Sequence, residues 1–290
     1  MHKCLIALLV VVSFPVAGKA QQYSTCQVTS IKAGANGNVA PSGVNSSDTV
    51  VGTFLTQSIV FHGFRWSNGN ASLSDFPGAT GTFLGGINDS NVSVGTAEHA
   101  DGSSSGFLLL GGEQTQTFTV PDAFTTSPSG INNLGVVVGT YQDSAAGQTI
   151  GFMKQGSNFT NIQFPGALST SPAKINDTGV VTGTYSDSTT NHGFVYFNCQ
   201  YVAIDVPGSA ETEAKGVNNA GTIVGEFRES AEAEGKGFTY SNGTYTAFMY
   251  PTSTYTELDA INMAGDRVGS SITSDIGGFL NGPAFLLKCQ

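Results

Sequence analysis

Short apolar runs alternate with polar turn residues along the chain, and residues 129–166 show the pattern most clearly. Val136–Tyr141 is a run of β-branched and aromatic side chains, followed by shorter runs over Gly151–Lys154 and Phe159–Phe164. Asn, Asp, Gly and Pro separate the runs. Runs of this kind between turn residues predict strands of a four-stranded antiparallel meander. No segment has a sustained helical period, so we expect an all-β chain.

One motif returns six times: Gly, Ala or Lys, then Val or Ile, then Asn, with a Gly seven residues after the Asn. Its asparagines are Asn45, Asn88, Asn132, Asn176, Asn218 and Asn262, and its glycines are Gly52, Gly95, Gly139, Gly183, Gly225 and Gly269. The asparagine spacings are 43, 44, 44, 42 and 44 residues. A period in this range predicts a propeller, solenoid or array of one supersecondary unit. Six meanders of four strands favour a six-bladed β-propeller.

The repeated residues have structural interpretations. Asn-Asn/Asp-x-Gly is a turn sequence, in which Asn bonds nearby backbone and Gly accepts a positive φ. A ring of six amides around a channel mouth is the functional alternative. The strand glycines indicate a close backbone approach, which we attribute to blades crowded around an axis, or a bulge. A recurring Gly-Phe pair predicts aromatic core between blades, at Phe64, Phe107, Phe152, Phe194 and Phe238.

The consensus Gly-Ile-Asn-x-x-Gly-x-Val-Val-Gly, followed by His-Gly-Phe-x-Trp, resembles the extracellular HAF repeats of bacterial exported proteins. His62–Trp66 is the closest copy of that family's His-Ala-Phe-x-Trp run, and His192–Tyr196 is a second. The other units lack the His. The resemblance covers about residues 41–279 and implies a repeat type without implying an activity. The WD-type repeat has a similar period, but its Trp-Asp signature is missing from this chain.

The chain ends predict how the ring closes. The last unit stops after its third strand, at Ala284–Gln290, and the chain begins with an orphan strand at Cys26–Ile31. We expect this strand to complete the last blade, with a Cys26–Cys289 disulfide in place of the missing hairpin turn. Cys199 is left over and is interpreted as a spare thiol. Gly277–Leu280 competes with Ala284–Phe285 for the third-strand position.

Residues 1–20 have the features of a secretory signal peptide: Lys3, an apolar stretch, and Gly18-Lys19-Ala20 as a small-x-small cleavage site. Residues 21–290 then form a single six-repeat domain, which we expect to be secreted, extracellular or periplasmic, monomeric and without a membrane anchor. The formal charge of −10 argues against nucleic acid and anionic membranes as partners, because neither is attracted to a negative surface.

Candidate chemistry is sparse. No nucleophile elbow, phosphate-binding loop, dinucleotide fingerprint or metal-binding His spacing occurs, so we identify no catalytic residue, cofactor or metal ligand. His62 and His192 are expected to form hydrogen bonds at blade edges. Acidic side chains gather in the loops between second and third strands, where a calcium site is the alternative to solvated loops. These residues include Glu98, Asp101, Asp143, Asp187, Glu229, Glu232 and Glu234.

Two functions are compatible with this sequence. The first is a binding or interaction module that uses one propeller face for a glycan or a protein. The second is a hydrolase or lyase with its site at the channel mouth. Fold analogy does not decide between them. Special chemistry is expected where the repeat is broken, and the candidates are Arg65, Trp66, Glu226 and Arg228.

Overall fold

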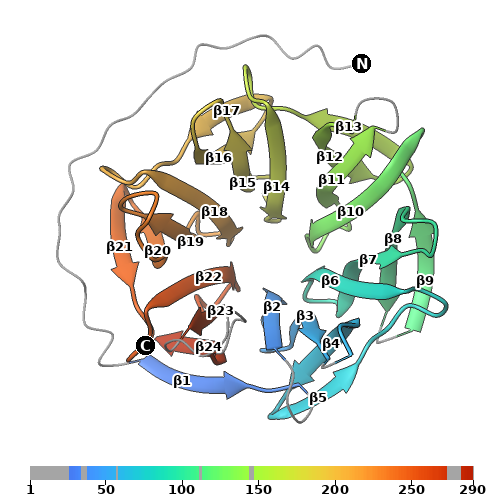
Figure 1. Cartoon of the computed structure of the whole chain (residues 1–290), viewed down its shortest axis with the longest axis horizontal. Helices are drawn as coiled ribbons and strands as arrows, with labels where there is room; N and C mark the ends of the chain where they lie inside the picture. The colour runs from blue at the N-terminus through green and yellow to red at the C-terminus, as the bar shows by residue number, and fades with distance from the viewer. Residues whose placement is uncertain are drawn as a thin grey trace.

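The computed structural model describes residues 26–33, 38–56, 58–110, 113–143, 147–272 and 282–289. The predicted signal peptide and Phe279 lie outside these residues. Within them, 24 strands form six four-stranded antiparallel sheets, with no helix, arranged as blades around a common axis (Figure 1). The predicted six-bladed β-propeller is confirmed. No helix long and apolar enough to cross a bilayer occurs in the part of the chain that is described.

Five blades are continuous in sequence, and each runs from an inner strand to an outer one. Blade 1 contains β2 (Asn38–Val44), β3 (Val50–Leu55), β4 (Phe61–Ser67) and β5 (Asn70–Leu73). Blade 2 contains β6 (Gly81–Ile87), β7 (Val92–Glu98), β8 (Ser104–Leu110) and β9 (Glu113–Phe118). Blade 3 contains β10 (Ala123–Ile131), β11 (Val137–Asp143), β12 (Thr149–Gln155) and β13 (Asn158–Ile162).

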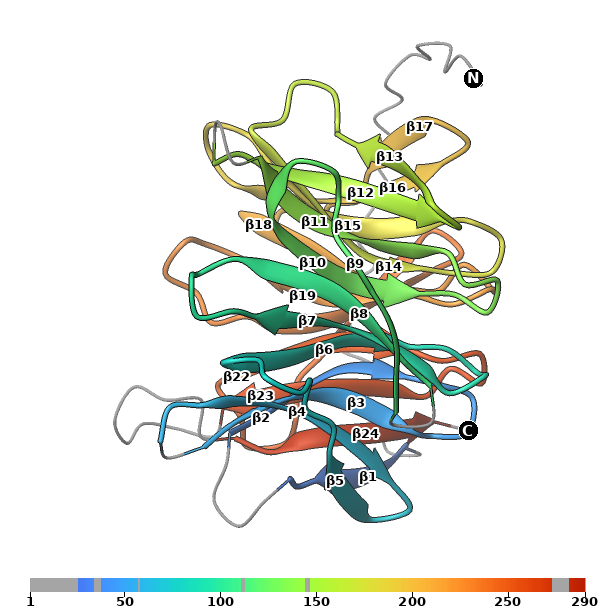
Figure 2. The same ribbon diagram turned by 90° about the vertical axis from the view of Figure 1, so that its right-hand side faces the viewer.

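The second half of the chain repeats this order. Blade 4 contains β14 (Ser169–Ile175), β15 (Val181–Ser186), β16 (Asn191–Phe197) and β17 (Gln200–Ala203). Blade 5 contains β18 (Glu211–Val217), β19 (Ile223–Arg228), β20 (Lys236–Ser241) and β21 (Thr244–Phe248). Seen from the side, the strands run between the two faces of the ring (Figure 2).

Blade 6 is assembled from both ends of the described chain. It contains β22 (Tyr255–Ile261), β23 (Arg267–Ile272), β24 (Ala284–Cys289) and, as its outer strand, β1 (Cys26–Ile31). β1 is antiparallel to β24, and Cys26 lies opposite Cys289. Phe285 lies opposite Gly269, as Phe64 lies opposite Gly52 in blade 1. Ala284–Phe285 therefore occupies the third-strand position.

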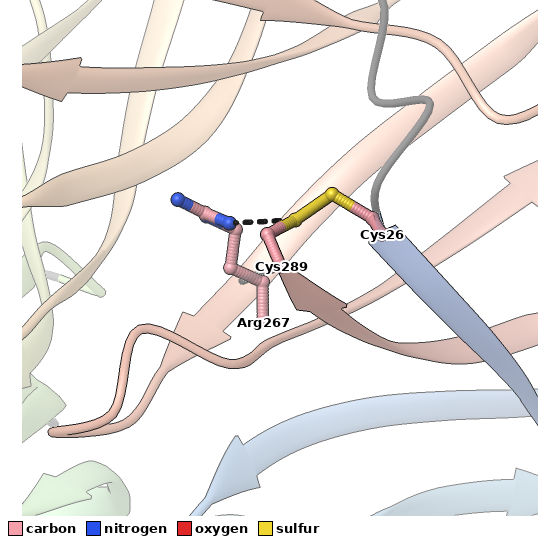
Figure 3. Close-up of a disulfide and its surroundings, with 3 residues drawn as sticks. All are labelled: Cys26, Arg267 and Cys289. Atoms are coloured by element: carbon pink, nitrogen blue, oxygen red, sulfur yellow. Dashed lines mark hydrogen bonds between the residues drawn. A yellow bond between two sulfur atoms is a disulfide. The ribbon is translucent and has the colours of Figure 1, made fainter.

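A disulfide joins the two outermost strands of blade 6, β24 and β1, as predicted. The sulfur atoms of Cys26 and Cys289 are 2.07 Å apart and their Cα atoms 4.1 Å apart. Arg267 Nη1 donates a hydrogen bond of 3.4 Å to Cys289 Sγ (Figure 3). The interpretation of Cys199 as a spare thiol is wrong, because Cys199 is disulfide-bonded. It occupies the turn between the outer strands β16 and β17.

The strand glycines make room within each blade rather than between blades. In every blade the first strand carries a bulge beside the residue that pairs with this Gly. A Cβ on Gly139 would lie 2.3 Å from Ser127 O and 3.0 Å from the ring of Phe152. The six aromatic rings that cover these glycines have 0% exposure, and they are Phe64, Phe107, Phe152, Phe194, Phe238 and Phe285.

The apolar core lies between neighbouring blades. One cluster joins Val138 and Ile162 of blade 3 to Val181 and Phe194 of blade 4, and equivalent clusters fill the other junctions. Both faces of a blade are therefore covered, which explains why second and third strands have apolar runs instead of a strict alternation.

The six repeat asparagines form a closed ring of hydrogen bonds at one face, which we call the Asn face. Asn132 Oδ1 accepts hydrogen bonds from the backbone N–H groups of Leu134 and Val136, as expected for a turn. Its Nδ2 donates to Asn176 O of the next blade at 3.0 Å. All six asparagines make this inter-blade bond, and Asn262 closes the ring onto Asn45 O at 3.1 Å.

Candidate functional site

The residue three positions before each repeat asparagine is the extra residue of a β-bulge on the inner strand. Because a bulged residue leaves the regular pairing, its side chain is free to point toward the axis. Five of these six residues line the central channel. In chain order the six are Ser42, Gly85, Ser129, Ala173, Lys215 and Asp259. The first four are small, whereas the two in blades 5 and 6 are charged.

The channel contains a cavity of about 550 Å³, which we call the channel cavity. Glu213, Lys215 and Lys174 are its charged lining residues. Nine further lining residues carry a hydroxyl or amide group: Ser42, Ser127, Ser129, Thr140, Ser169, Ser171, Thr184, Ser186 and Asn191. Hydroxyl groups donate and accept hydrogen bonds, so this lining suits a ligand that is rich in hydroxyls.

The channel cavity lies on the side of the ring opposite the Asn face. Its lining includes Ser186 and Asn191, which flank the loop between the second and third strands of blade 4. We call this side the channel face. The depression at the Asn face is much smaller, at about 70 Å³, and the repeat asparagines line it. A ligand of drug size therefore fits the channel face and not the Asn face.

Lys215 is the centre of a charged cluster that extends from the channel cavity into blades 5 and 6. Its Nζ lies 3.5 Å from Glu226 Oε2, 3.6 Å from Glu213 Oε2 and 3.6 Å from Asp259 Oδ1. It also donates a hydrogen bond to Glu257 Oε2. We call these four carboxylates and Lys215 the Lys215 cluster. Because one ammonium faces four carboxyl groups, the cluster carries an excess of negative charge when all are ionised.

Tyr255 and Ser270 complete the cluster on its blade 6 side. Tyr255 OH donates a hydrogen bond to Glu226 Oε2 and lies 3.1 Å from Glu257 Oε2. Ser270 Oγ donates to Glu257 Oε1. Tyr255 and Ser270 also line a separate cleft of about 230 Å³ between blades 6 and 1, whose walls include Leu55 and Phe61. The carboxylates are thus held in fixed positions by donors from three strands.

Burial changes the ionisation of the cluster. Burial opposes the charged form of Lys215, but Glu257, Asp259 and Glu226 raise its pKa well above the ordinary value. Burial, with the nearby Glu257 carboxylate, raises the pKa of Asp259 well above its usual range. Burial also raises the pKa of Glu226. For Glu257 burial is outweighed by Lys215 and by hydrogen bonds, which lower its pKa. The cluster therefore contains carboxyls that ionise over different pH ranges.

The four sequence candidates occupy three different environments. Glu226 lies in the Lys215 cluster with its side chain 6% exposed, and Arg228 Nη2 lies 3.8 Å from Glu226 Oε1 on the channel face. Arg65 points to the Asn face, where its Nη2 donates to Asn91 Oδ1 at 2.7 Å. Trp66 is buried in the core between blades 6 and 1. The structure brings Glu226 and Arg228 together and separates both from Arg65 and Trp66.

Sequence reasoning missed Lys174, Glu213, Lys215, Glu257 and Asp259. An alignment of the six repeats contains the signal that could have identified them. At five and three positions before the asparagine, the other blades have Ser, Ala, Phe or Gly where blades 5 and 6 have Glu213, Lys215, Glu257 and Asp259. Aligning the six units on the asparagine places these charges together in two adjacent units.

The histidines lie at blade edges, away from the channel cavity. His62 Nδ1 is 2.7 Å from Asp75 Oδ2, and His192 Nδ1 is 3.0 Å from Asp205 Oδ2. An aromatic ring of the second strand stacks on each His, Phe54 on His62 and Tyr185 on His192. Among the described residues no group of three or more His, Cys, Asp or Glu is placed to hold a metal ion.

Comparison with known proteins identifies the fold and leaves the family open. No family model and no curated protein matches the chain. Among solved structures, streptogramin B lyase matches 94% of this chain and 100% of its own, with 12% identity and a TM-score of 0.53. A gluconolactonase from Xanthomonas campestris matches 96% and 94%, with 11% identity and a TM-score of 0.55. An Aleuria aurantia lectin in complex with Fucα1-6GlcNAc matches 86% and 94%, with 10% identity and a TM-score of 0.51. These similarities show that the chain is a β-propeller.

Proposed function

We propose that this protein is an exported, non-enzymatic binding module that takes a glycan in the channel cavity. The hydroxyl-rich lining of this cavity is the observation that carries the proposal. Its volume of about 550 Å³ falls within the usual range for small-molecule sites. Saccharide hydroxyls require neighbouring donors and acceptors. The lining residues Ser127, Thr140, Ser171 and Thr184 offer both. Ser42 and Ser129 donate to backbone carbonyls and offer acceptors. Glu213 and Lys215 add a charged acceptor and a charged donor, which form the stronger hydrogen bonds.

Two further observations support this proposal. The Aleuria aurantia lectin, which has a similar fold, is in complex with Fucα1-6GlcNAc, so the architecture is compatible with glycan binding. The Cys26–Cys289 disulfide suits an oxidising, exported environment, where the predicted signal peptide would direct the chain. We also propose that the mature chain acts as a monomer, as a ring that is closed within one chain allows.

The alternative, a hydrolase or lyase at the channel mouth, has less support. Paired carboxylates in glycosidases stand apart across the scissile bond, with one kept available as an acid. Here Glu226 and Glu257 both contact Tyr255 OH and Lys215 Nζ. The two carboxylates therefore share the same two partners, and they do not face each other across a space in which a glycosidic bond could lie.

A glycan array, followed by titration calorimetry on the best ligand, tests the proposal with residues 21–290. Glu213→Gln should weaken binding by about tenfold, the loss expected when a charged acceptor becomes neutral. Glu232→Gln is the matched control, because it makes the same charge change on an exposed loop of the channel face. Its affinity should stay within about twofold of the parent protein.

Several results would contradict the proposal. These are a failure to bind any glycan, an equal loss for both variants, or the release of smaller products from the bound glycan in mass spectrometry. The last result would support the hydrolase or lyase instead.

A further inference from the structure

We propose that Lys174 is a nucleophilic amine that captures an aldehyde in the channel cavity as an imine. The natural source of such an aldehyde would be the open-chain form of a reducing sugar. This inference rests on the proposed glycan-binding function, and it specifies the chemical group that the cavity recognises.

Lys174 breaks the repeat at a position where a side chain is hard to place. Two residues before the repeat asparagine, the other five blades have Gly43, Gly86, Gly130, Gly216 and Ala260. These small residues pack against the backbone of the next blade. A Cβ on Gly130, for example, would lie 2.9 Å from Ala173 O and 3.0 Å from Lys174 Cα. Only blade 4 places a long side chain in this ring of close contacts, and that side chain lines the channel cavity.

The surroundings of the Lys174 amine differ from those of Lys215. Lys174 Nζ donates to two neutral acceptors, Ser129 O at 2.9 Å and Ala173 O at 3.2 Å. Among the described residues no carboxylate lies within salt-bridge distance of it, whereas Lys215 has four. Two charged groups act on it from farther away: Asp259 on β22 favours its ammonium form and Lys215 on β18 opposes it.

Burial is the main cause that lowers the pKa of Lys174, to about 8. About a tenth of such an amine is neutral at pH 7, roughly a few hundred times the neutral fraction of an exposed lysine. Burial beside another cation is the arrangement that activates lysine as a nucleophile toward carbonyl groups. The cavity thus combines a reactive amine with hydroxyl side chains that can hold the oxygens of a sugar.

The chemistry requires no oxidant and no reductant. The neutral Lys174 nitrogen adds to the aldehyde carbon, and one of its protons passes to the carbonyl oxygen to give a carbinolamine. The C–O bond then breaks, and the oxygen leaves as water. The second proton of the nitrogen leaves with this oxygen, so the product is a neutral imine, which becomes positively charged when it takes up a proton from water. Hydrolysis reverses the sequence and releases the aldehyde unchanged.

Reductive trapping tests the inference. Residues 21–290 are incubated at pH 7 with glyceraldehyde and cyanoborohydride, which converts an imine into a stable secondary amine, and peptide mass mapping locates the adducts. Lys174 should be labelled at least about tenfold faster than the exposed Lys32, because its larger neutral fraction outweighs the lower nucleophilicity of a less basic amine. A reducing disaccharide should label Lys174 and compete with glyceraldehyde, and its alditol, which has no aldehyde, should not label it. Labelling by glyceraldehyde alone would make a small free aldehyde the ligand.

The pH dependence of labelling keeps the test informative even if a variant fails to fold. In the native protein the labelling rate of Lys174 should rise with a midpoint near pH 8, while that of Lys32 keeps rising to higher pH. Lys174→Arg should remove the adduct. Equal labelling of both lysines, or adducts that persist in Lys174→Arg, would overturn the inference. Glycan binding without labelling of Lys174 would overturn it too, but would leave the proposed function intact.

Discussion

Each repeat asparagine serves two blades at once. Its side-chain oxygen satisfies two backbone N–H groups of its own turn, and its side-chain nitrogen satisfies a backbone carbonyl of the next blade. No other short side chain supplies both functions from one position, because Asp lacks the donor and Ser is too short to offer the same pair. The motif is therefore a turn signal that also fixes neighbouring blades to each other.

Asn132→Ala should destabilise the protein by about 2–4 kcal/mol, because it leaves buried backbone groups without partners. Asn132 is 4% exposed. Urea unfolding followed by fluorescence gives the free energy. Leu134→Ala in the same turn is the control, and since Leu134 is 73% exposed it should change stability by less than about 0.5 kcal/mol. Equal stability of the two variants would contradict the role of the ring.

Asp259→Asn should stabilise the protein at pH 8. A carboxyl whose pKa is higher in the folded protein than in the unfolded chain binds more protons when folded, so its contribution to stability falls as pH rises through the folded pKa. The pKa of Asp259 is raised by burial and by Glu257, so its charge costs stability at high pH. The variant should gain on the order of 1 kcal/mol at pH 8, and the gain should vanish toward pH 4.

Lys215 remains paired in this variant, because Glu213, Glu226 and Glu257 still surround it. Glu232→Gln makes the same charge change at an exposed position and should have little effect at either pH. Denaturant titrations at several pH values decide the question. A loss of stability at pH 8, or a gain that does not depend on pH, would show that Asp259 is not the destabilising charge.

At the scale of single elements, β1 has the most consequence because it joins residues that are distant in sequence. The disulfide beside it closes a loop with a sequence separation of 263 residues. In the chain-entropy model such a cross-link stabilises by about 5.5 kcal/mol, a value that native-state effects reduce. Without the disulfide, β1 has only its hydrogen bonds to β24 and side-chain packing to hold it in blade 6.

Replacing Cys26, Cys289 or both by Ser should lower the free energy of unfolding by several kcal/mol, and by the same amount in all three variants. The two single changes remove one and the same bond, so their effects should not add. Urea unfolding of the three variants measures this. A double variant that loses the sum of the two single losses would indicate that each cysteine acts through separate contacts.

The strands and their order were predictable because the signals are local. Turn residues and the paired Gly and Phe lie within one repeat length, and tertiary packing does not override them. The displaced terminal strand was predictable because the last unit stops after its third strand. The reason for glycines such as Gly139 was only partly predictable, since the close approach comes from a carbonyl and a ring of the same blade. The Lys215 cluster was not predicted, because it gathers residues from two blades through bulges that turn side chains toward the axis.

The remaining candidates show the limits of residue type as a guide. Trp66, the only tryptophan, is a core residue. Glu226, a charge within an apolar strand, does lie in the Lys215 cluster. A residue that departs from its equivalents in the other blades is therefore a better indicator of this site than a rare residue type.

At the scale of the whole molecule, each of the six similar units contacts two neighbours, so the contacts form a closed ring. Repeat proteins depend on contacts between neighbouring units, and an open array has two terminal units with uncovered faces. Here the faces of blades 1 and 6 cover each other, and Asn262 and Asn45 are hydrogen-bonded across the junction. The ring leaves no terminal unit exposed.

Moving residues 26–33 to the C-terminus tests how the ring closes. In this permuted chain an Asn-Gly turn follows residue 289 and leads directly into β1, as a two-residue hairpin turn allows, and both cysteines are Ser. We expect the same sheet content and cooperative unfolding, because every blade keeps its strands. We expect unfolding at lower urea than for the oxidised parent, because no covalent link joins blade 6 to blade 1. Equal stability would mean that the shared blade contributes nothing to closure.

The blade that is built from both β1 and β24 also determines when the ring can close during folding. A chain that emerges from its N-terminus first can form blades 1 to 5 in order as each hairpin becomes available. Its first strand, however, has no sheet to join until the last six described residues have been delivered. A copy that stops short of β24 keeps an unpaired strand and uncovered blade faces, so it differs in its surface from a finished copy. Closure of the ring therefore waits for β24, the strand that β1 joins.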